Sequence, residues 1–194
     1  MSISAVWKLV RSFIAVDLTA GEAVRNIVEA QAALKACGAD LKLVEPENLH
    51  FTLKFLGELS SKELKDVEDA LSEVVFKPFK ITLESVGFFP NAKYMRVVWV
   101  GVSEGLEALQ QVASAVERRI VEKGFPREER GFSPHLTIAR VKSSRGREGL
   151  LKTVEGWRGR VFGTQEVWEV KLKKSELTPR GPVYTDLYIR KAQP

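Results

Sequence analysis

The chain has 194 residues, of which 44% are hydrophobic, and a formal net charge of +5. This length fits one ordinary domain, or two small lobes around one cleft. No apolar run reaches the roughly 18–20 residues of a transmembrane helix, so we expect no membrane span. The single cysteine, Cys37, excludes an internal disulfide and favours a reducing cytoplasm. The positive charge favours an anionic partner such as nucleic acid, although a merely soluble basic protein would look the same.

The first half of the chain alternates strands and helices. In chain order we expect a strand, a helix, a strand, a helix and two strands, at 11–18, 19–38, 50–57, 60–75, 77–90 and 93–102. Gly38 is a stop signal for the first helix, and Ser60 and Glu63 have the spacing of a capping box at the start of the second. A turn around Pro90 and Asn91 joins the last two strands.

The second half begins in a similar way. In chain order we expect a long helix, a polar loop, a strand, a short helix after a turn, and two closing strands, at 103–124, 125–134, 135–142, 143–157, 161–177 and 181–190. Short connections favour antiparallel pairing, and therefore an α+β fold. Each half reads as a helix-and-strand unit, which is consistent with an ancient duplication and pseudo-twofold symmetry. Residues 1–10 are interpreted as a short leader or tail.

One small pattern contains both histidines of the chain. His50 and His135 are each followed two positions later by a threonine, Thr52 and Thr137, within HFTLKFLG and HLTIARVK. Threonine occupies only 8 of the 194 positions, so coincidence is a poor explanation for the repeat.

Strand geometry predicts what each motif presents. Side chains on a strand alternate between its two faces, so His50, Thr52 and Lys54 are expected on one face. The intervening residues form an apolar face that belongs in the core: Phe51, Leu53 and Phe55. The second motif follows the same rule, with His135 and Thr137 on its polar face. Each motif therefore presents an imidazole and a hydroxyl on the face opposite the core.

Two chemistries suit such a pair of histidines. Metal sites usually recruit further carboxylate, Cys or His ligands, and no Asp or Glu lies on the polar face of either motif, so we expect no metal. General acid–base catalysis on a phosphate ester fits better, because one imidazole activates the nucleophile while the other protonates the leaving oxygen. Threonine hydroxyls beside them can donate hydrogen bonds to the charged phosphate oxygens.

HFTLKFLG and HLTIAR resemble the paired signatures of the two-histidine phosphoesterase superfamily. More narrowly, the chain resembles the RNA 2′,3′-cyclic phosphodiesterase, or 2′-5′ RNA ligase, family of archaea and bacteria. The similarity covers nearly the whole chain from Arg11. RSFIAVDL resembles the opening strand of that family, VGFFPN and MRVVWVGV its middle, and SELTPRGPVYTDLYIR its closing part.

The resemblance implies a fold, an activity and roles for the motif residues. The fold would be one bilobal α+β domain over 1–194, with an antiparallel sheet in each lobe and a central cleft. The activity would be hydrolysis of 2′,3′-cyclic phosphate at RNA 3′ ends, giving a 2′-phosphate without cofactor or metal. In that family the first histidine donates the proton and the second accepts it, which makes His50 the donor and His135 the acceptor, with Thr52 and Thr137 holding the phosphate. The residues alone do not say which histidine is the acid.

Other residues are candidates for substrate binding. Arg140 could meet phosphate, but strict alternation places it opposite His135 unless the strand ends or bulges first. Lys54 could attract the anion or lie at a solvated strand end. Phe132 could stack on a base or fill the core. Basic loop residues that could line the rim of the cleft are Lys93, Arg127 and Arg130.

Alternative functions remain open from the sequence. The same acid–base pair run backwards would join RNA ends by a 2′-5′ bond. A binding module could hold a nucleotide or RNA end in the same cleft without turnover, although it would need neither an acid nor a base. No stretch has the pattern of a P-loop or a dinucleotide fingerprint. We expect a cytoplasmic monomer that acts on RNA 3′ ends, tRNA halves among them.

Overall fold

The computed structural model describes residues 9–194 except Ala20, Arg130 and Arg180. In chain order its elements are β1 (Val10–Asp17), α1 (Glu22–Ala36), β2 (Leu41–Leu43), the 3₁₀ turn η1 (Pro46–Asn48), β3 (His50–Leu59), α2 (Ser61–Ser72), β4 (Phe79–Phe89), β5 (Val97–Val102), α3 (Leu106–Glu122), β6 (Leu136–Val141), α4 (Arg147–Glu155), β7 (Val161–Val167), β8 (Glu169–Thr178) and β9 (Gly181–Lys191). The predicted α+β class is confirmed.

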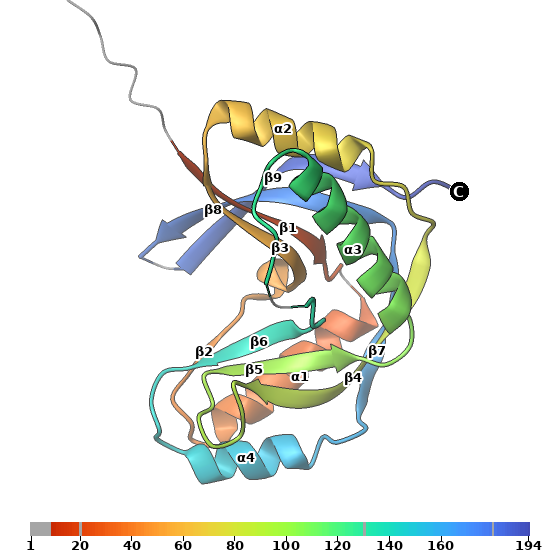
Figure 1. Ribbon diagram of the computed structural model, residues 1–194. Coiled ribbons are helices and arrows are strands. Elements are labelled where there is room, and N and C mark those ends of the chain that lie inside the picture. Colours follow the sequence, from red (N-terminus) through yellow and green to blue (C-terminus); the bar gives the residue numbers. More distant parts are fainter. Residues whose placement is uncertain (1–8, 20, 130, 180) are drawn as a thin grey trace, which may run out of the picture.

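The strands form one curled sheet in which the described pairs are antiparallel. Their order is β7-β4-β5-β6-β3-β1-β8-β9, and β2 pairs with β6. The sheet is weakest at its middle, because β3 and β6 share only the pair Phe51–Leu136. The strands on either side of this junction form two lobes (Figure 1).

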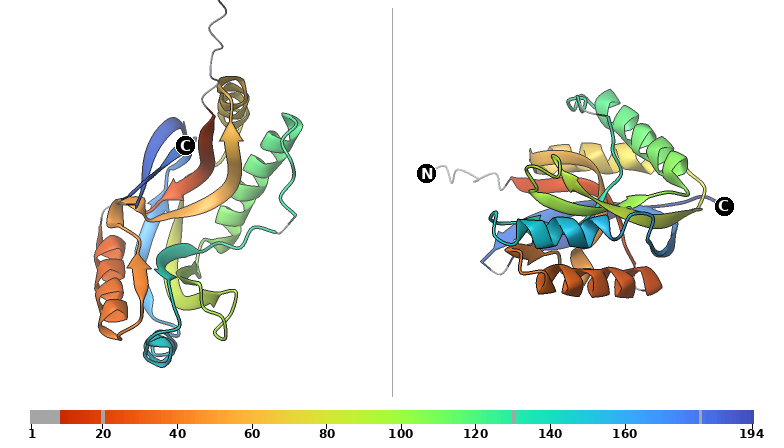
Figure 2. Two further views of the ribbon diagram at one scale, coloured as in Figure 1. Left: turned by 90° about the vertical axis from the view of Figure 1, so that its left-hand side faces the viewer. Right: turned by 90° about the horizontal axis from the view of Figure 1, so that it is seen from below.

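Each lobe is built from both halves of the chain. The β3 lobe contains β1, β3, β8 and β9 with α2 and α3, and the β6 lobe contains β2, β4, β5, β6 and β7 with α1 and α4. Helix α1 precedes the first motif yet packs on the lobe of the second, and α3 does the reverse. Figure 2 shows α1 and α3 on opposite sides of the molecule. The two H-x-T strands therefore meet at the junction of two interleaved lobes.

Most expected elements are present, with shifted ends. The capping box at α2 is confirmed, since the Ser60 hydroxyl accepts from the Glu63 backbone and the Glu63 side chain accepts from the Ser60 backbone. The single strand expected at 161–177 is two strands, which are separated at Trp168. Strand β7 pairs in one lobe and β8 in the other. Val10, expected in the leader at 1–10, is instead the first residue of β1, and residues 1–8 lie outside the described residues.

The sheet faces that point away from the cleft carry the core. Phe51 and Leu136, the pair that joins the lobes, are completely buried. Burial of two such large apolar side chains stabilises the junction by several kcal/mol, at roughly 25 cal/mol per Å² of apolar area. Across the part of the chain that the structure describes, no helix is both long and apolar enough to cross a membrane.

Candidate active site

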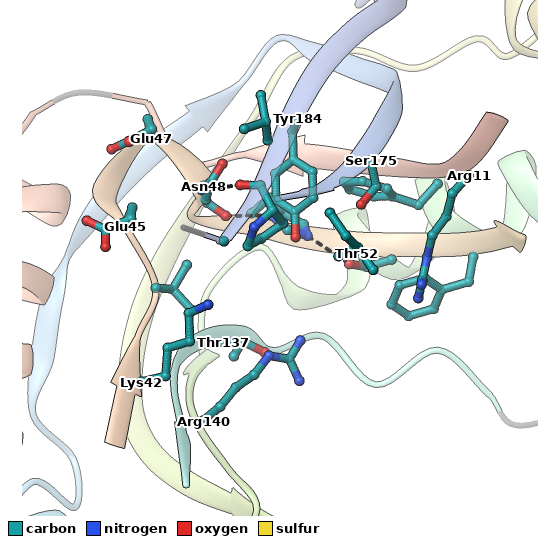
Figure 3. Close-up of a pocket in the computed structure, with 18 of the residues that line it drawn as sticks. Arg11, Lys42, Glu45, Glu47, Asn48, Thr52, Thr137, Arg140, Ser175 and Tyr184 are labelled. Atoms are coloured by element: carbon teal, nitrogen blue, oxygen red, sulfur yellow. Dashed lines mark hydrogen bonds between the residues drawn. The ribbon is translucent and has the colours of Figure 1, made fainter. Parts of the chain in front are cut away.

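A pocket of about 830 Å³ lies between the two lobes and receives both motifs. His50 and Thr52 line it from β3, and His135 and Thr137 line it from the other lobe. Figure 3 shows Thr52 on one wall and Thr137 on the facing wall. The four motif residues expected to act together are thus brought together. The alternation rule was sufficient for this, because each threonine follows its histidine before the first irregularity of its strand.

The two imidazole rings are held in the same way. The Nδ1 atom of His50 lies 2.7 Å from the Asn48 carbonyl oxygen, and Nδ1 of His135 lies 2.8 Å from the Ser133 carbonyl oxygen. A carbonyl can only accept, so each Nδ1 carries the hydrogen. Each Nε2 is then the nitrogen that takes up or gives a proton. In His50 this atom lies 3.1 Å from the Thr52 hydroxyl oxygen.

Aromatic rings cover both imidazoles. Tyr184 meets His50 edge-on, with ring centroids 5.3 Å apart, and Phe13 lies 5.0 Å from the same ring. Phe89 meets His135 edge-on at 4.8 Å. Each histidine therefore has a fixed ring plane as well as a fixed tautomer, and this order favours directional proton transfer.

The environment of His50 changes its acidity. Burial lowers the pKa of His50 below its ordinary value of 6.5, and the hydrogen bond to the Asn48 carbonyl and the negative charge of Asp17 offset this in part. Asp17 lies directly opposite His50 in the β1–β3 ladder. A lower pKa makes the protonated His50 a stronger acid. It also means that a smaller fraction of His50 is protonated at neutral pH.

A β-bulge follows the threonine of the first motif. In the β1–β3 ladder Ala15 pairs with Thr52 and Ile14 pairs with Lys54, so Leu53 is an extra residue in β3. The bulge reverses the alternation for Lys54 and Phe55, and a second register shift follows at Leu56.

The second motif contains the same irregularity. Val98 pairs with Ala139 and Trp99 with Thr137, so Ile138 is the extra residue in β6. Leu53 and Ile138 each lie three positions after a motif histidine, so the two motifs match in backbone as well as in sequence.

The bulges decide which neighbouring side chains reach the pocket. Arg140 lies after the second bulge and does line the pocket, which was expected only if the strand bulged. Phe55 was expected in the core, and this is wrong: it lines the pocket and is 69% exposed. Phe55 and Arg140 occupy equivalent positions, five residues after His50 and His135. One side of the cleft thus presents an aromatic ring where the other presents a guanidinium.

The first bulge turns Lys54 away from the cleft, which corrects its expected place beside Thr52. Its ammonium lies 2.6 Å from a carboxylate oxygen of Glu117 in α3 and donates to the Pro126 carbonyl at 2.9 Å. Its side chain is only 4% exposed. The second carboxylate oxygen of Glu117 accepts from the Glu128 backbone at 2.7 Å. Lys54 therefore fastens the loop that leads to His135.

The remaining candidates do not line the pocket. Phe132 is half-buried and packs against the core, which was the second of the two places expected for it. Arg127 and Lys93 are exposed and lie elsewhere on the surface. Arg130 lies outside the described residues.

Sequence reasoning missed several residues of the pocket wall. Arg11, Phe13 and Tyr184 come from β1 and β9, Lys42 from β2 and Phe89 from β4. All but Lys42 are far from the motifs in sequence, and the strand pairing brings them together. The one available signal was that their segments, apart from that of Lys42, resemble the family.

The fold and the site define a class: a two-histidine phosphoesterase, with one H-x-T motif from each of two pseudo-symmetric lobes. The profile described as LigT-like phosphoesterase matches the chain twice, over residues 18–99 and 100–184. The chain belongs to the LigT-like phosphoesterase family. The double match also agrees with the duplication expected from the two motifs.

Relatives and solved structures are similar over almost the whole chain. The RNA 2′,3′-cyclic phosphodiesterase of Methanothermobacter thermautotrophicus is 43% identical over 183 residues, covering 93% of this chain and 97% of the relative. That of Aquifex aeolicus is 38% identical, covering 92% and 95%. The structure of TT0787 of Thermus thermophilus has a TM-score of 0.77 at 30% identity, covering 93% and 97%. Escherichia coli LigT complexed with 3′-AMP has a TM-score of 0.75 at 26% identity, covering 96% and 99%.

Proposed function

We propose that this protein hydrolyses 2′,3′-cyclic phosphates at the 3′ ends of RNA and leaves a 2′-phosphate. The observation that carries the proposal is the pair of imidazoles in one pocket, each with Nδ1 bound to a carbonyl two residues earlier, which leaves Nε2 as the nitrogen that exchanges a proton. The names of the relatives and the 3′-AMP complex of a neighbour support an RNA end as the substrate.

In this mechanism His135 takes a proton from water through Nε2 as the water oxygen bonds to phosphorus. The bond from phosphorus to the 3′ oxygen breaks, and His50 gives its Nε2 proton to that oxygen. The donor role suits the lowered pKa of His50, because a stronger acid protonates a departing alkoxide more readily. After one turnover His135 carries an extra proton and His50 lacks one. Proton exchange with solvent returns both histidines to their starting states.

The threonines and Arg140 bind the phosphate. Thr52 and Thr137 approach from facing walls and can each donate a hydroxyl hydrogen to a non-bridging oxygen, where charge builds in the transition state. Arg140 lies on the same wall as Thr137 and supplies a positive charge. Lys54 and Phe132 are left out of the binding site, since one is engaged by Glu117 and the other packs against the core.

Two other functions use the same cleft. Reversal of the reaction would join a cyclic phosphate to a 5′-hydroxyl by a 2′-5′ bond, although the high concentration of water favours hydrolysis. A binding module would hold the RNA end without turnover. We further propose that the chain is a single bilobal domain and a monomer, that it works in the cytoplasm, and that tRNA halves are among its substrates.

Product analysis tests the function. A short RNA ending in a 2′,3′-cyclic phosphate is incubated with the protein, and ³¹P NMR identifies the product. A 2′-phosphate supports the proposal, and a 3′-phosphate contradicts the assignment of the leaving oxygen. Incubation of tRNA halves with a 5′-hydroxyl partner detects ligation. Tight binding of the product with no turnover of any cyclic phosphate would favour the binding module.

A further inference from the structure

Two cations stand side by side on one wall of the pocket. Lys42 in β2 lies directly opposite Arg140 in β6, and both line the pocket. Figure 3 shows both side chains rising from the wall that carries Thr137. Like charges directly opposite each other in an antiparallel ladder destabilise the fold. Neither residue forms an ion pair with any residue that the structure describes.

The other cations near the cleft face acidic residues rather than another cation. Arg11 at the far end of the pocket lies directly opposite Glu58 in the β1–β3 ladder. The buried Lys173 is bound by Asp17 at 2.7 Å and by Asp186 at 2.6 Å. Lys42 and Arg140 differ from these groups because each has a like charge directly opposite it, and an anion from the substrate would relieve this repulsion.

The acidic residues of the pocket do not fill this role. Glu45 and Glu47 also line it, just beyond β2. Their side chains point away from Lys42 (Figure 3) and form no ion pair with it. Neither glutamate therefore neutralises the positive charge of Lys42.

Lys42 lies on β2, beside the tip of the β8–β9 hairpin, whereas Arg140 lies on β6, the strand of Thr137. A side-chain carbon on Gly181, at the tip of the β8–β9 hairpin, would be 3.4 Å from Nζ of Lys42. The ammonium therefore sits between β2 and this hairpin. Arg140 is next to Val97 in the β5–β6 ladder, close to the Trp99–Thr137 pair. Arg140 is therefore the nearer cation to Thr137 along the sheet, and Lys42 is one strand farther away.

We propose that Lys42 binds the phosphodiester that precedes the terminal nucleotide, so that the pocket selects RNA ends of two or more nucleotides over mononucleotides. This inference rests on the proposed function. A mononucleoside cyclic phosphate has one negative charge, which the reacting centre uses. Each further nucleotide adds one phosphate charge, and the next phosphate along the chain meets Lys42 beside the β8–β9 hairpin.

Binding of products tests this subsite without turnover. Titration calorimetry measures the affinities of a nucleoside 2′-phosphate, the same nucleoside as its 2′,5′-bisphosphate, and a dinucleotide ending in a 2′-phosphate. The proteins compared are wild type, Lys42→Met, Lys42→Arg and Arg11→Met. The matched control is Lys142→Met, an exposed lysine just after β6 that does not line the pocket.

The wild type should bind the dinucleotide and the bisphosphate at least about tenfold more tightly than the monophosphate. Lys42→Met should remove most of this advantage, Lys42→Arg should restore it, and Lys142→Met should keep it. The slope of log affinity against log salt for the dinucleotide should fall by about 0.7 in Lys42→Met, as expected for one lost phosphate contact on a single strand.

Two results would overturn the inference. One is that the wild type shows no preference for the dinucleotide, or that the preference survives in Lys42→Met. The other is that Arg11→Met alone removes it, which would place the RNA exit at the opposite end of the pocket. Failure of the proposed function looks different: the wild type would hydrolyse no cyclic phosphate, while the affinities would still decide whether Lys42 binds a second phosphate.

Discussion

His50 packs edge-on against Tyr184, with ring centroids 5.3 Å apart and ring planes at 89°. Tyr184 comes from β9, which is more than a hundred residues away in sequence and belongs to the second half of the chain. It shields an imidazole whose pKa is already lowered by burial. The contact therefore links the interleaving of the lobes to the proton chemistry of the site.

Tyr184→Ala should raise the pKa of His50 toward its ordinary value of 6.5, because water then reaches the imidazole. NMR titration of the ring protons measures this, and the chain's only other histidine, His135, serves as the internal control. A pKa of His50 that stays in place or falls would contradict the view that burial by Tyr184 contributes to the shift.

The pH profile follows from the same shift. If His50 donates the proton, the free enzyme must carry it protonated, so kcat/KM should fall as the pH rises through the lowered pKa of His50. In Tyr184→Ala this falling limb should move to higher pH. Measurement of kcat/KM across the pH range checks both statements, and a limb that moves to lower pH would contradict the donor role.

Lys54→Met should destabilise the fold without weakening phosphate binding. The change leaves the Glu117 carboxylate and the Pro126 carbonyl without their buried donor. Because Glu117 is partly exposed, we expect a cost of about 2 kcal/mol, at the lower end for a broken pair. Urea unfolding measures the free energy of unfolding, and calorimetry measures product affinity.

Arg140→Met is the matched comparison for Lys54→Met. Arg140 is exposed to the pocket and forms no ion pair with the described residues, so its loss should change stability by less than about 0.5 kcal/mol while product affinity drops. If instead Lys54→Met weakened product binding and Arg140→Met left it intact, Lys54 rather than Arg140 would be the phosphate-binding residue.

Phe51→Ala and Phe55→Ala should separate stability from binding. Phe51 is fully buried, so its truncation should cost about 3–5 kcal/mol of unfolding free energy. Phe55 is 69% exposed, so its truncation should cost under about 0.5 kcal/mol. Since Phe55 lines the pocket, a stacked base would lose about 1–3 kcal/mol of binding in that variant. Equal destabilisation by both changes would contradict the bulge at Leu53.

Thr137→Val should lower kcat by about a hundredfold, since one hydroxyl donor to the charged phosphate oxygens is lost with little change in shape. Thr185→Val on the exposed part of β9 is the control, and it should keep full activity. Steady-state kinetics with a cyclic phosphate substrate measures both. A kcat for Thr137→Val that matches the control would remove this threonine from the mechanism.

The sequence was sufficient to place the four motif residues of the candidate site and insufficient for their surroundings. His50, Thr52, His135 and Thr137 could be placed because period-two alternation holds over the first three residues of each motif. It fails at the next residue, because a bulge has no signature in a single sequence. Lys54 and Phe55 were therefore assigned to the wrong faces.

The rest of the pocket depends on long-range topology. Tyr184 reaches His50 only because β9 joins the lobe of β3, and Lys42 reaches Arg140 only because β2 pairs with β6. The break at Trp168, which sends β7 and β8 to different lobes, occurs inside a run of strand-forming residues and has no local cause in the pattern. Strand propensity predicts where a strand lies in the sequence, but it does not predict which other strand it pairs with.

The most direct test of the central claim is single-turnover hydrolysis of a short RNA ending in a 2′,3′-cyclic phosphate, with EDTA present. Wild type, His50→Ala and His135→Ala are compared, and circular dichroism confirms that the variants fold. The account predicts release of a 2′-phosphate by the wild type in EDTA and loss of at least about two orders of magnitude in rate for each variant. Undiminished turnover in either variant, or a wild type that EDTA inactivates, would contradict catalysis by the paired histidines.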